Sequence, residues 1–151
     1  MKPIIIFFLI GLALSYNPTA AVKYAKAHCR SYNSHFNNYK GNGGDCANFV
    51  CQCLMAGGID IKNQCKGHYS YWDGKCIVRV KDIRSCLSHL GWKYSKTLPS
   101  QFKAGYPMVH TDGSHTILAV SVSGKSVRFA GHTTDYCDQP LSASVYYYYL
   151  P

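Results

Sequence analysis

The spacing of apolar and polar residues predicts helices in the first half of the chain and strands in the second. Asn17 followed by Pro18 and a run of good helix formers is typical of a helix start. Asp45 is a suitable N-cap for a second helix, which the pair Gly57-Gly58 would close. A third helix has its apolar residues on one face. The predicted helices are residues 18–32, 46–56 and 81–90, with a loop region at 59–80.

The second half of the chain has the pattern of β-strands. Residues 115–122 and 126–130 are separated by the turn residues Ser123-Gly124-Lys125, so they are predicted to form a hairpin. Residues 146–149 predict a final strand. Helices first and antiparallel strands second predict one α+β domain, with N-terminal helices packed on a C-terminal antiparallel sheet.

The N-terminal segment has the pattern of a secretion signal. Lys2 gives a basic start, and the apolar run from Ile4 to Leu14 is shorter than the about 20 residues that a membrane span requires. Small residues at Ala13 and Ser15 fit a cleavage site after Ser15. We therefore expect residues 1–15 to be a signal peptide and residues 16–151 to be a single domain that is secreted, extracellular and not stably inserted in a membrane.

Composition agrees with secretion and excludes some partners. Eight cysteines among 151 residues are many for a cytosolic protein, whereas a secreted chain can pair them in disulfides. The net charge of +9 has no clustered basic run, so it predicts a diffuse attraction for anionic substrates such as bacterial walls. The sequence has no nucleic-acid-binding motif, and we expect no nucleic acid partner.

Cys46 stands at the predicted start of the second helix, directly after a glycine-rich loop. Backbone N–H groups and the positive helix dipole there favour a thiolate, so a low pKa is expected for this thiol. Nearby glycines would let a substrate backbone come close. Taken alone, Cys46 is better explained as one half of a disulfide, because seven other cysteines compete for it.

The predicted hairpin brings two histidines to the same end and changes that interpretation. If Val122 pairs with Ser126, His115 lies opposite position 133, next to His132. A thiol, a base histidine and a second polar group that orients the histidine form the arrangement of a thiol hydrolase. We therefore expect Cys46 as nucleophile, His115 as base and His132 as the orienting group.

Other uses of these residues stay open. Cys46, His115 and His132 are also the residue types that bind zinc, although the close Cys/His spacing of structural zinc sites is absent. Asp135 is a second candidate for the orienting group. Tyr69, Tyr71 and Trp72 are expected to line a groove or to pack in the core. The polar residues expected to be solvated or packed are Gln52, His68, His89, His110 and Asp112.

At these residues the chain resembles the putative amidase domain family of the papain-like superfamily, which is related to NlpC-type and CHAP cell-wall hydrolases. The resemblance spans nearly all of residues 16–151, and its segments fall in the family's order. It is carried by Tyr16-Asn17, residues 20–25, residues 44–54 around Gly44-Asp45-Cys46, residues 56–58, Gly91-Trp92, Ser114-His115-Thr116 and residues 130–135.

The resemblance implies a papain-like fold, with the nucleophile on a helix packed against an antiparallel sheet that carries the histidines. It implies Cys46 as nucleophile, His115 as general base and His132 at the third polar position, without a metal or an organic cofactor. Relatives cleave amide or isopeptide bonds, often in peptidoglycan stem peptides. The expected partner is therefore a peptide or peptidoglycan substrate, and the enzyme is expected to be a monomer.

The chain also departs from the family pattern. Relatives commonly have Ser at the position of Cys51 and Arg at that of Pro18, and the Gly-Asp before the first sheet strand appears here as Gly105-Tyr106. Because such segments form pocket walls, these departures leave the substrate open. The alternative function is a catalytically inactive secreted module or effector, which binds a wall or glycan through its charge and aromatic residues.

A nucleophilic Cys46 changes how the other cysteines can pair. One further thiol must then stay free, and Cys53 is the candidate because it shares a helix face with Phe49 and Ala56. The remaining six allow at most three disulfides, with Cys65–Cys76 as the first guess. These six are Cys29, Cys51, Cys65, Cys76, Cys86 and Cys137.

Overall fold

The computed structural model describes residues 15–151, so the expected signal peptide lies outside the described residues except for Ser15. Within this range, helices precede strands and the fold is α+β, as predicted. The elements are α1 (Pro18–His28), α2 (Cys46–Ala56), α3 (Ile61–Gln64), α4 (Val80–His89), β1 (Lys93–Ser95), β2 (Pro107–His110), β3 (Thr116–Ser123), β4 (Ser126–Gly131), β5 (Tyr136–Pro140) and β6 (Val145–Tyr149).

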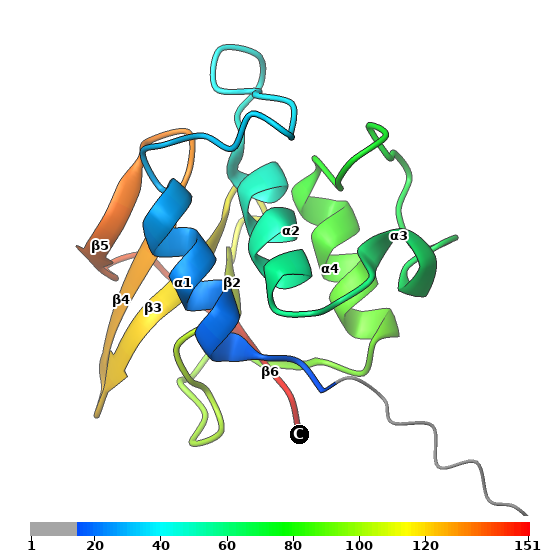
Figure 1. Ribbon diagram of the computed structural model, residues 1–151. Coiled ribbons are helices and arrows are strands. Elements are labelled where there is room, and N and C mark those ends of the chain that lie inside the picture. The colour runs from blue at the N-terminus through cyan, green and yellow to red at the C-terminus, as the bar shows by residue number, and fades with distance from the viewer. Residues whose placement is uncertain (1–14) are drawn as a thin grey trace, which may run out of the picture.

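The six strands form one antiparallel sheet in the order β1-β6-β2-β3-β4-β5. Figure 1 shows α1 and α2 side by side in front of the sheet, and both pack on β3. Helix α4 packs against α2. The core lies between these helices and the sheet, where Ala21 and Ala25 of α1, Phe49 of α2, and Ile117 and Leu118 of β3 are fully buried. Small residues on α1 let this helix approach the strands closely.

The helix boundaries confirm most of the local predictions. Helix α2 has the predicted bounds, and the predicted third helix is found as α4. The Asn17 side chain caps α1 by accepting a hydrogen bond of 3.0 Å from the backbone N–H of Ala20. Strands β1, β2 and β5 had no pattern of their own: β1 is three residues long, and four of the five side chains of β5 are exposed. Within residues 15–151, no helix has the length and apolar character needed to cross a membrane.

Three disulfides tie the loops to the helices. Cys46 and Cys53 are free within the described residues, as predicted. The predicted pair Cys65–Cys76 is wrong, because residues 59–80 contain α3 and are held against other helices rather than against themselves. The disulfides are Cys29–Cys137 between the end of α1 and β5, Cys51–Cys76 between α2 and the loop, and Cys65–Cys86 between the end of α3 and α4.

The β3–β4 hairpin reaches the expected register by a different route. Ser123 pairs with Ser126 across a Gly124-Lys125 turn, one position away from the predicted pairing of Val122 with Ser126. A register shift between Ala119 and Ser121 then restores the predicted offset, and Leu118 pairs with Ala130. His115 lies before β3 and position 133 lies after β4, so the predicted pairing of these two positions falls beyond the ends of the hairpin strands.

Gly105 marks the place where the start of α1 meets the strands. Its φ angle is +92°, and a Cβ added to it would lie 2.3 Å from the carbonyl oxygen of Pro18. The Tyr16 hydroxyl also donates a hydrogen bond of 2.5 Å to the Gly105 carbonyl. Only glycine fits this close approach of two backbones.

We expect Gly105→Ala to destabilise the protein more than Gly74→Ala. Gly74 has a nearly equal φ of +96° but open space around it, so its substitution adds only the left-handed backbone strain, about 1–2 kcal/mol. Gly105→Ala adds the overlap with Pro18 to that strain. Urea denaturation with the disulfides intact measures both, and equal losses of unfolding free energy would contradict the close approach.

Candidate active site

Cys46 is the first residue of α2, and two glycines lead into it. Gly43 and Gly44 have φ angles of +84° and +101°, which favour glycine and turn the chain sharply into the helix. Asp45 occupies the N-cap position, but its side chain makes no capping hydrogen bond to the helix. Asp45 therefore stands where the cap was predicted, but its carboxylate does not cap the helix and points elsewhere.

The Cys46 thiol is enclosed between α2 and β3. Cys46 is only 9% exposed, and this burial raises the pKa of its thiol. Backbone groups of Thr116, Ala47 and Cys46 itself oppose this and lower the pKa in part, while the charge of Asp45 raises it. The prediction of a low pKa for Cys46 is wrong, because desolvation outweighs the helix N-terminus. Thr116 is the residue that follows His115, and it begins the strand on which α2 packs.

His115 lies at the turn between β2 and β3, opposite another histidine. The His110 backbone N–H donates a hydrogen bond of 2.9 Å to the His115 carbonyl, and the two rings meet edge to face at 5.1 Å. Burial and then the charge of His110 lower the pKa of His115, with Asp112 opposing them. His115 is therefore a neutral imidazole near pH 7, which is the state that accepts a proton. His110 is half-buried beside it rather than fully solvated.

A pocket of about 260 Å³ opens next to His115. Its walls come from the β2–β3 turn, β4, β5 and the segment after β5. Its lining residues are His110, His115, Phe129, Tyr136, Gln139, Pro140, Leu141, Ser142 and Ala143. No carboxylate lines it, so acceptor-rich groups such as peptide carbonyls meet imidazole, amide and hydroxyl groups there.

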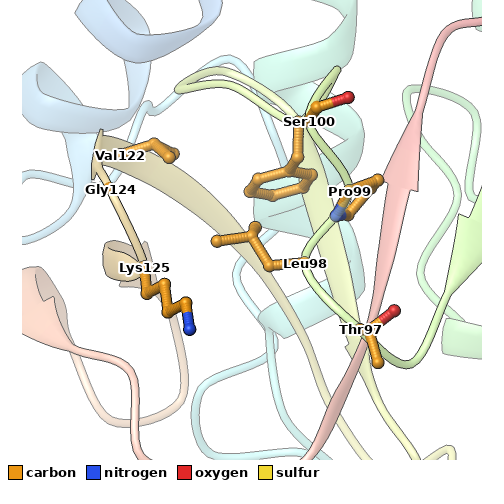
Figure 2. Close-up of a pocket in the computed structure, with 8 residues that line it drawn as sticks. Thr97, Leu98, Pro99, Ser100, Val122, Gly124 and Lys125 are labelled. Atoms are coloured by element: carbon orange, nitrogen blue, oxygen red, sulfur yellow. The ribbon is translucent and has the colours of Figure 1, made fainter.

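A second pocket, of about 420 Å³, lies at the other end of the β3–β4 hairpin. Figure 2 shows Leu98 and Val122 pointing towards one another in it, near Gly124 and Lys125 of the hairpin turn. Val122, which lines this pocket, lies about 20 Å along β3 from Thr116, since a strand rises about 3.3 Å per residue. The pocket is therefore separate from Cys46 and His115.

His132 is buried at the N-terminus of α2, and both of its ring nitrogens have partners. Nδ1 lies 2.6 Å from Oδ2 of Asp45, and Nε2 lies 2.8 Å from the carbonyl oxygen of His28. The ring is stacked between Tyr32 and Phe49, with centroid distances of 3.9 and 4.1 Å. The contact predicted for His132, a hydrogen bond to His115, is not among the hydrogen bonds of the described residues.

The other candidates have structural partners. Asp135 accepts hydrogen bonds from Tyr32 at 2.7 Å and from Lys40 at 2.6 Å, which directs it away from His115. Gln52 accepts a hydrogen bond of 2.6 Å from Tyr24, as expected for a packed helix residue. The rings of His68 and His89 are stacked, with centroids 3.5 Å apart, and the rings of Tyr69 and Trp72 pack with centroids 5.5 Å apart.

Sequence reasoning missed the pairing of Asp45 with His132 and the position of His110. The signal for His110 was present, because His110 and His115 are symmetric about the Asp112-Gly113 turn. The pairing of Asp45 had no such signal, since its helix position favoured a capping role. Within residues 15–151, no group of three or more His, Cys, Asp or Glu side chains is placed to hold a metal ion.

One comparison with known proteins finds a family whose model covers more than half of the chain. The model of a family described as "putative amidase domain" matches residues 15–102, more than half of the chain, and this range includes Cys46 but ends before His115 and His132. No curated protein and no solved structure matches the chain. The family match supports hydrolysis of amide bonds as the class of activity, and three disulfides are compatible with an extracellular protein.

We expect iodoacetamide to alkylate Cys46 slowly at pH 7 and faster as the pH rises above 9.0, the ordinary pKa of a cysteine thiol. The thiolate is the reactive form, and burial raises the pKa, so the thiolate fraction grows only at high pH. Peptide mass spectrometry would follow the label, with Cys46→Ala as the blank. A rate that has already reached its plateau at pH 7 would contradict the raised pKa.

Proposed function

The chain belongs to the putative amidase domain family, and from this premise we propose that it is a cysteine-dependent amidase acting on peptides. One observation carries the proposal: Cys46 is the first residue of α2, and this helix packs on β3, the strand that begins directly after His115. A thiol at a helix N-terminus and an imidazole directly before the adjoining strand are the two groups that nucleophilic amide cleavage requires.

The resting state is a neutral pair rather than a thiolate–imidazolium pair. The pKa of Cys46 is raised and that of His115 is lowered, so the proton stays on sulfur. His115 removes this proton as the sulfur attacks the substrate carbonyl carbon, and the carbonyl oxygen gains the negative charge. Backbone N–H groups at the start of α2 are suited to stabilise that oxygen.

His115 transfers the proton in both halves of the reaction, the formation of the thioester and its hydrolysis. The protonated imidazole gives its proton to the leaving nitrogen, the C–N bond breaks, and a thioester to Cys46 remains. Water attacks the thioester with His115 again as base, which releases a carboxylic acid and restores the thiol. The same two side chains therefore complete hydrolysis, and water is the one further reactant.

Peptides of the bacterial wall are the proposed substrate, and secretion is the proposed location. The net charge of +9 favours an anionic polymer, and the pocket beside His115 has room for a peptide side chain. Residues 1–15 as a signal peptide and residues 16–151 as one papain-like, monomeric domain complete the proposal.

One observation favours an inactive binding module instead: the Cys46 thiol is enclosed and its pKa is raised. Such a module would bind a wall or glycan with equal affinity with or without the thiol. Saturable binding together with undetectable hydrolysis, both unchanged in Cys46→Ala, would support this second function.

We expect Cys46→Ala to reduce kcat/KM for a stem-peptide amide by about 10³-fold or more and His115→Gln by about 10²–10⁴-fold. The matched controls are Cys53→Ala, which removes the other free thiol, and His89→Gln on α4, and both should keep activity near that of the wild type. Release of the amine is the readout. Wild-type activity in Cys46→Ala would overturn the proposal.

The pH profile of kcat/KM should lose activity as the pH falls through the pKa of His115, below its ordinary 6.5. The base must be neutral, so activity is present above this pKa and lost below it. His110→Gln removes one cause of the lowered pKa and should move the acidic limb to higher pH. An acidic limb that stays in place in this variant would show that His110 does not act on the base.

A further inference from the structure

A buried histidine–carboxylate pair lies beside Cys46 without touching His115. We propose that His132, Asp45 and Thr133 together form a positioning element that fixes the first turn of α2, and that His132 acts on Cys46 through Asp45 rather than by orienting His115. The inference rests on the proposed function only in that Cys46 is the nucleophile.

Hydrogen bonds hold both ring nitrogens of His132 and both carboxylate oxygens of Asp45. The His28 carbonyl can only accept, so Nε2 of His132 carries a hydrogen. The Asp45 carboxylate accepts from the Tyr39 backbone N–H at 3.0 Å and from Nδ2 of Asn48 at 2.8 Å. Its other oxygen, Oδ2, lies 2.6 Å from Nδ1 of His132, so the pair is fixed from both sides.

The surroundings prevent His132 from reaching His115. The residue is 1% exposed, and its ring is held between the faces of Tyr32 and Phe49. Rotation towards His115 would leave two buried partners unsatisfied. The other titratable groups near the ring are Tyr32, whose pKa is raised by burial first, and Asp135, whose pKa is lowered by bonds from Lys40 and Tyr32 in spite of burial.

Asp45 transmits this restraint because every one of its polar groups has a partner. Its backbone N–H donates to Oγ1 of Thr133 at 3.0 Å, and its carbonyl accepts from Phe49 at 2.9 Å. Both carboxylate oxygens are occupied by the bonds described above. Asp45 is therefore held at its backbone N–H, its carbonyl and both carboxylate oxygens. This fixes the start of Cys46, the residue that follows it.

The pairing also decides what the start of α2 can bind. An Asp at the N-cap ordinarily accepts from N–H groups of the first turn, but this carboxylate is turned to His132 instead. The first-turn N–H groups are thus left to the sulfur and to a substrate oxygen. The charge of Asp45 raises the pKa of Cys46, and the contact with His132 holds Oδ2 of Asp45 away from the first turn of α2.

Backbone strain at Thr133 supports a functional role for the element. Thr133 is the one non-glycine residue in the described range with a positive φ, at +86°, which is unfavourable for a β-branched residue. In this conformation its hydroxyl reaches the Asp45 backbone. The disulfide Cys29–Cys137 fastens the same segment to the end of α1, next to the His28 carbonyl that His132 contacts.

The test measures the pH dependence of Cys46 alkylation in folded His132→Gln, Asp45→Asn and the double variant, with iodoacetamide as the probe. His132→Gln removes the partner that turns the Asp45 carboxylate away from the first turn of α2. The carboxylate can then compete for the first-turn N–H groups, so the alkylation curve should move to higher pH by about one unit. Asp45→Asn removes the charge that raises the pKa of Cys46 and should move the curve to lower pH. The double variant has no carboxylate to turn, so its curve should follow that of Asp45→Asn.

Asp82→Asn is the matched control, because Asp82 is also buried but accepts from Ser70 and Tyr71 on the far side of α2. It should lower the urea midpoint without moving the alkylation curve. Curves that stay in place in the His132 and Asp45 variants would reduce the element to a purely structural role and overturn the inference.

Activity measurements separate this inference from the orienting role. If His132 orients His115, His132→Gln should move the acidic limb of kcat/KM and leave alkylation unchanged, and the inference fails. If it acts through Asp45, kcat should fall about 10-fold or more with the acidic limb in place. Loss of the proposed function shows separately, as full activity in Cys46→Ala, while the alkylation curves still report on the element. If His132→Gln does not fold, Asp45→Asn alone decides by the direction of its shift.

Discussion

The docking of the α2 N-terminus onto the ends of β3 and β4 is the constraint on which the rest of the structure depends. The proposed nucleophile, Cys46, starts the helix, and the proposed base, His115, directly precedes the strand, so neither element alone places one against the other. The buried pair of His132 and Asp45 joins these two ends, since His132 follows β4 and Asp45 precedes α2. Removing one partner of such a pair leaves an uncompensated buried charge and costs about 3–5 kcal/mol, so the join is difficult to distort.

The disulfides and the close backbone contacts protect that join from a distance. Cys29–Cys137 ties α1 to β5, which flank the segment that carries His132, whereas Cys51–Cys76 and Cys65–Cys86 hold the loops to α2 and α4. A domain of this size buries a core sufficient to fold, so the covalent links mainly limit the unfolded chain and restrain loops. Two thiols remain outside this framework: Cys53, inside the core, and Cys46, at its edge.

The sequence predicted the elements that carry strong local signals and the residues of the nucleophile helix. Helix α2 and the β3–β4 hairpin follow from capping, glycine and alternation signals. The free state of Cys46 was predicted from its place at a helix start together with the histidine hairpin, and that of Cys53 from its helix face. The disulfide pairing did not follow, because connectivity depends on how a loop without periodicity folds over two helices. The partner of His132 did not follow either, because a capping position and a buried ion pair use the same Asp45 side chain.

The disagreement over the Cys46 pKa shows which physical effect controls the site. A helix N-terminus lowers the pKa of a thiol by partial charges, whose effect is modest next to the cost of moving a thiolate out of water. The fold encloses Cys46 under β3, so desolvation wins and the thiol stays protonated at rest. Burial and His110 keep His115 neutral in the same way. The two shifts are complementary in the proposed mechanism: a protonated nucleophile and an unprotonated base react only when a substrate carbonyl is in place to receive the sulfur, which protects the buried thiol from other electrophiles.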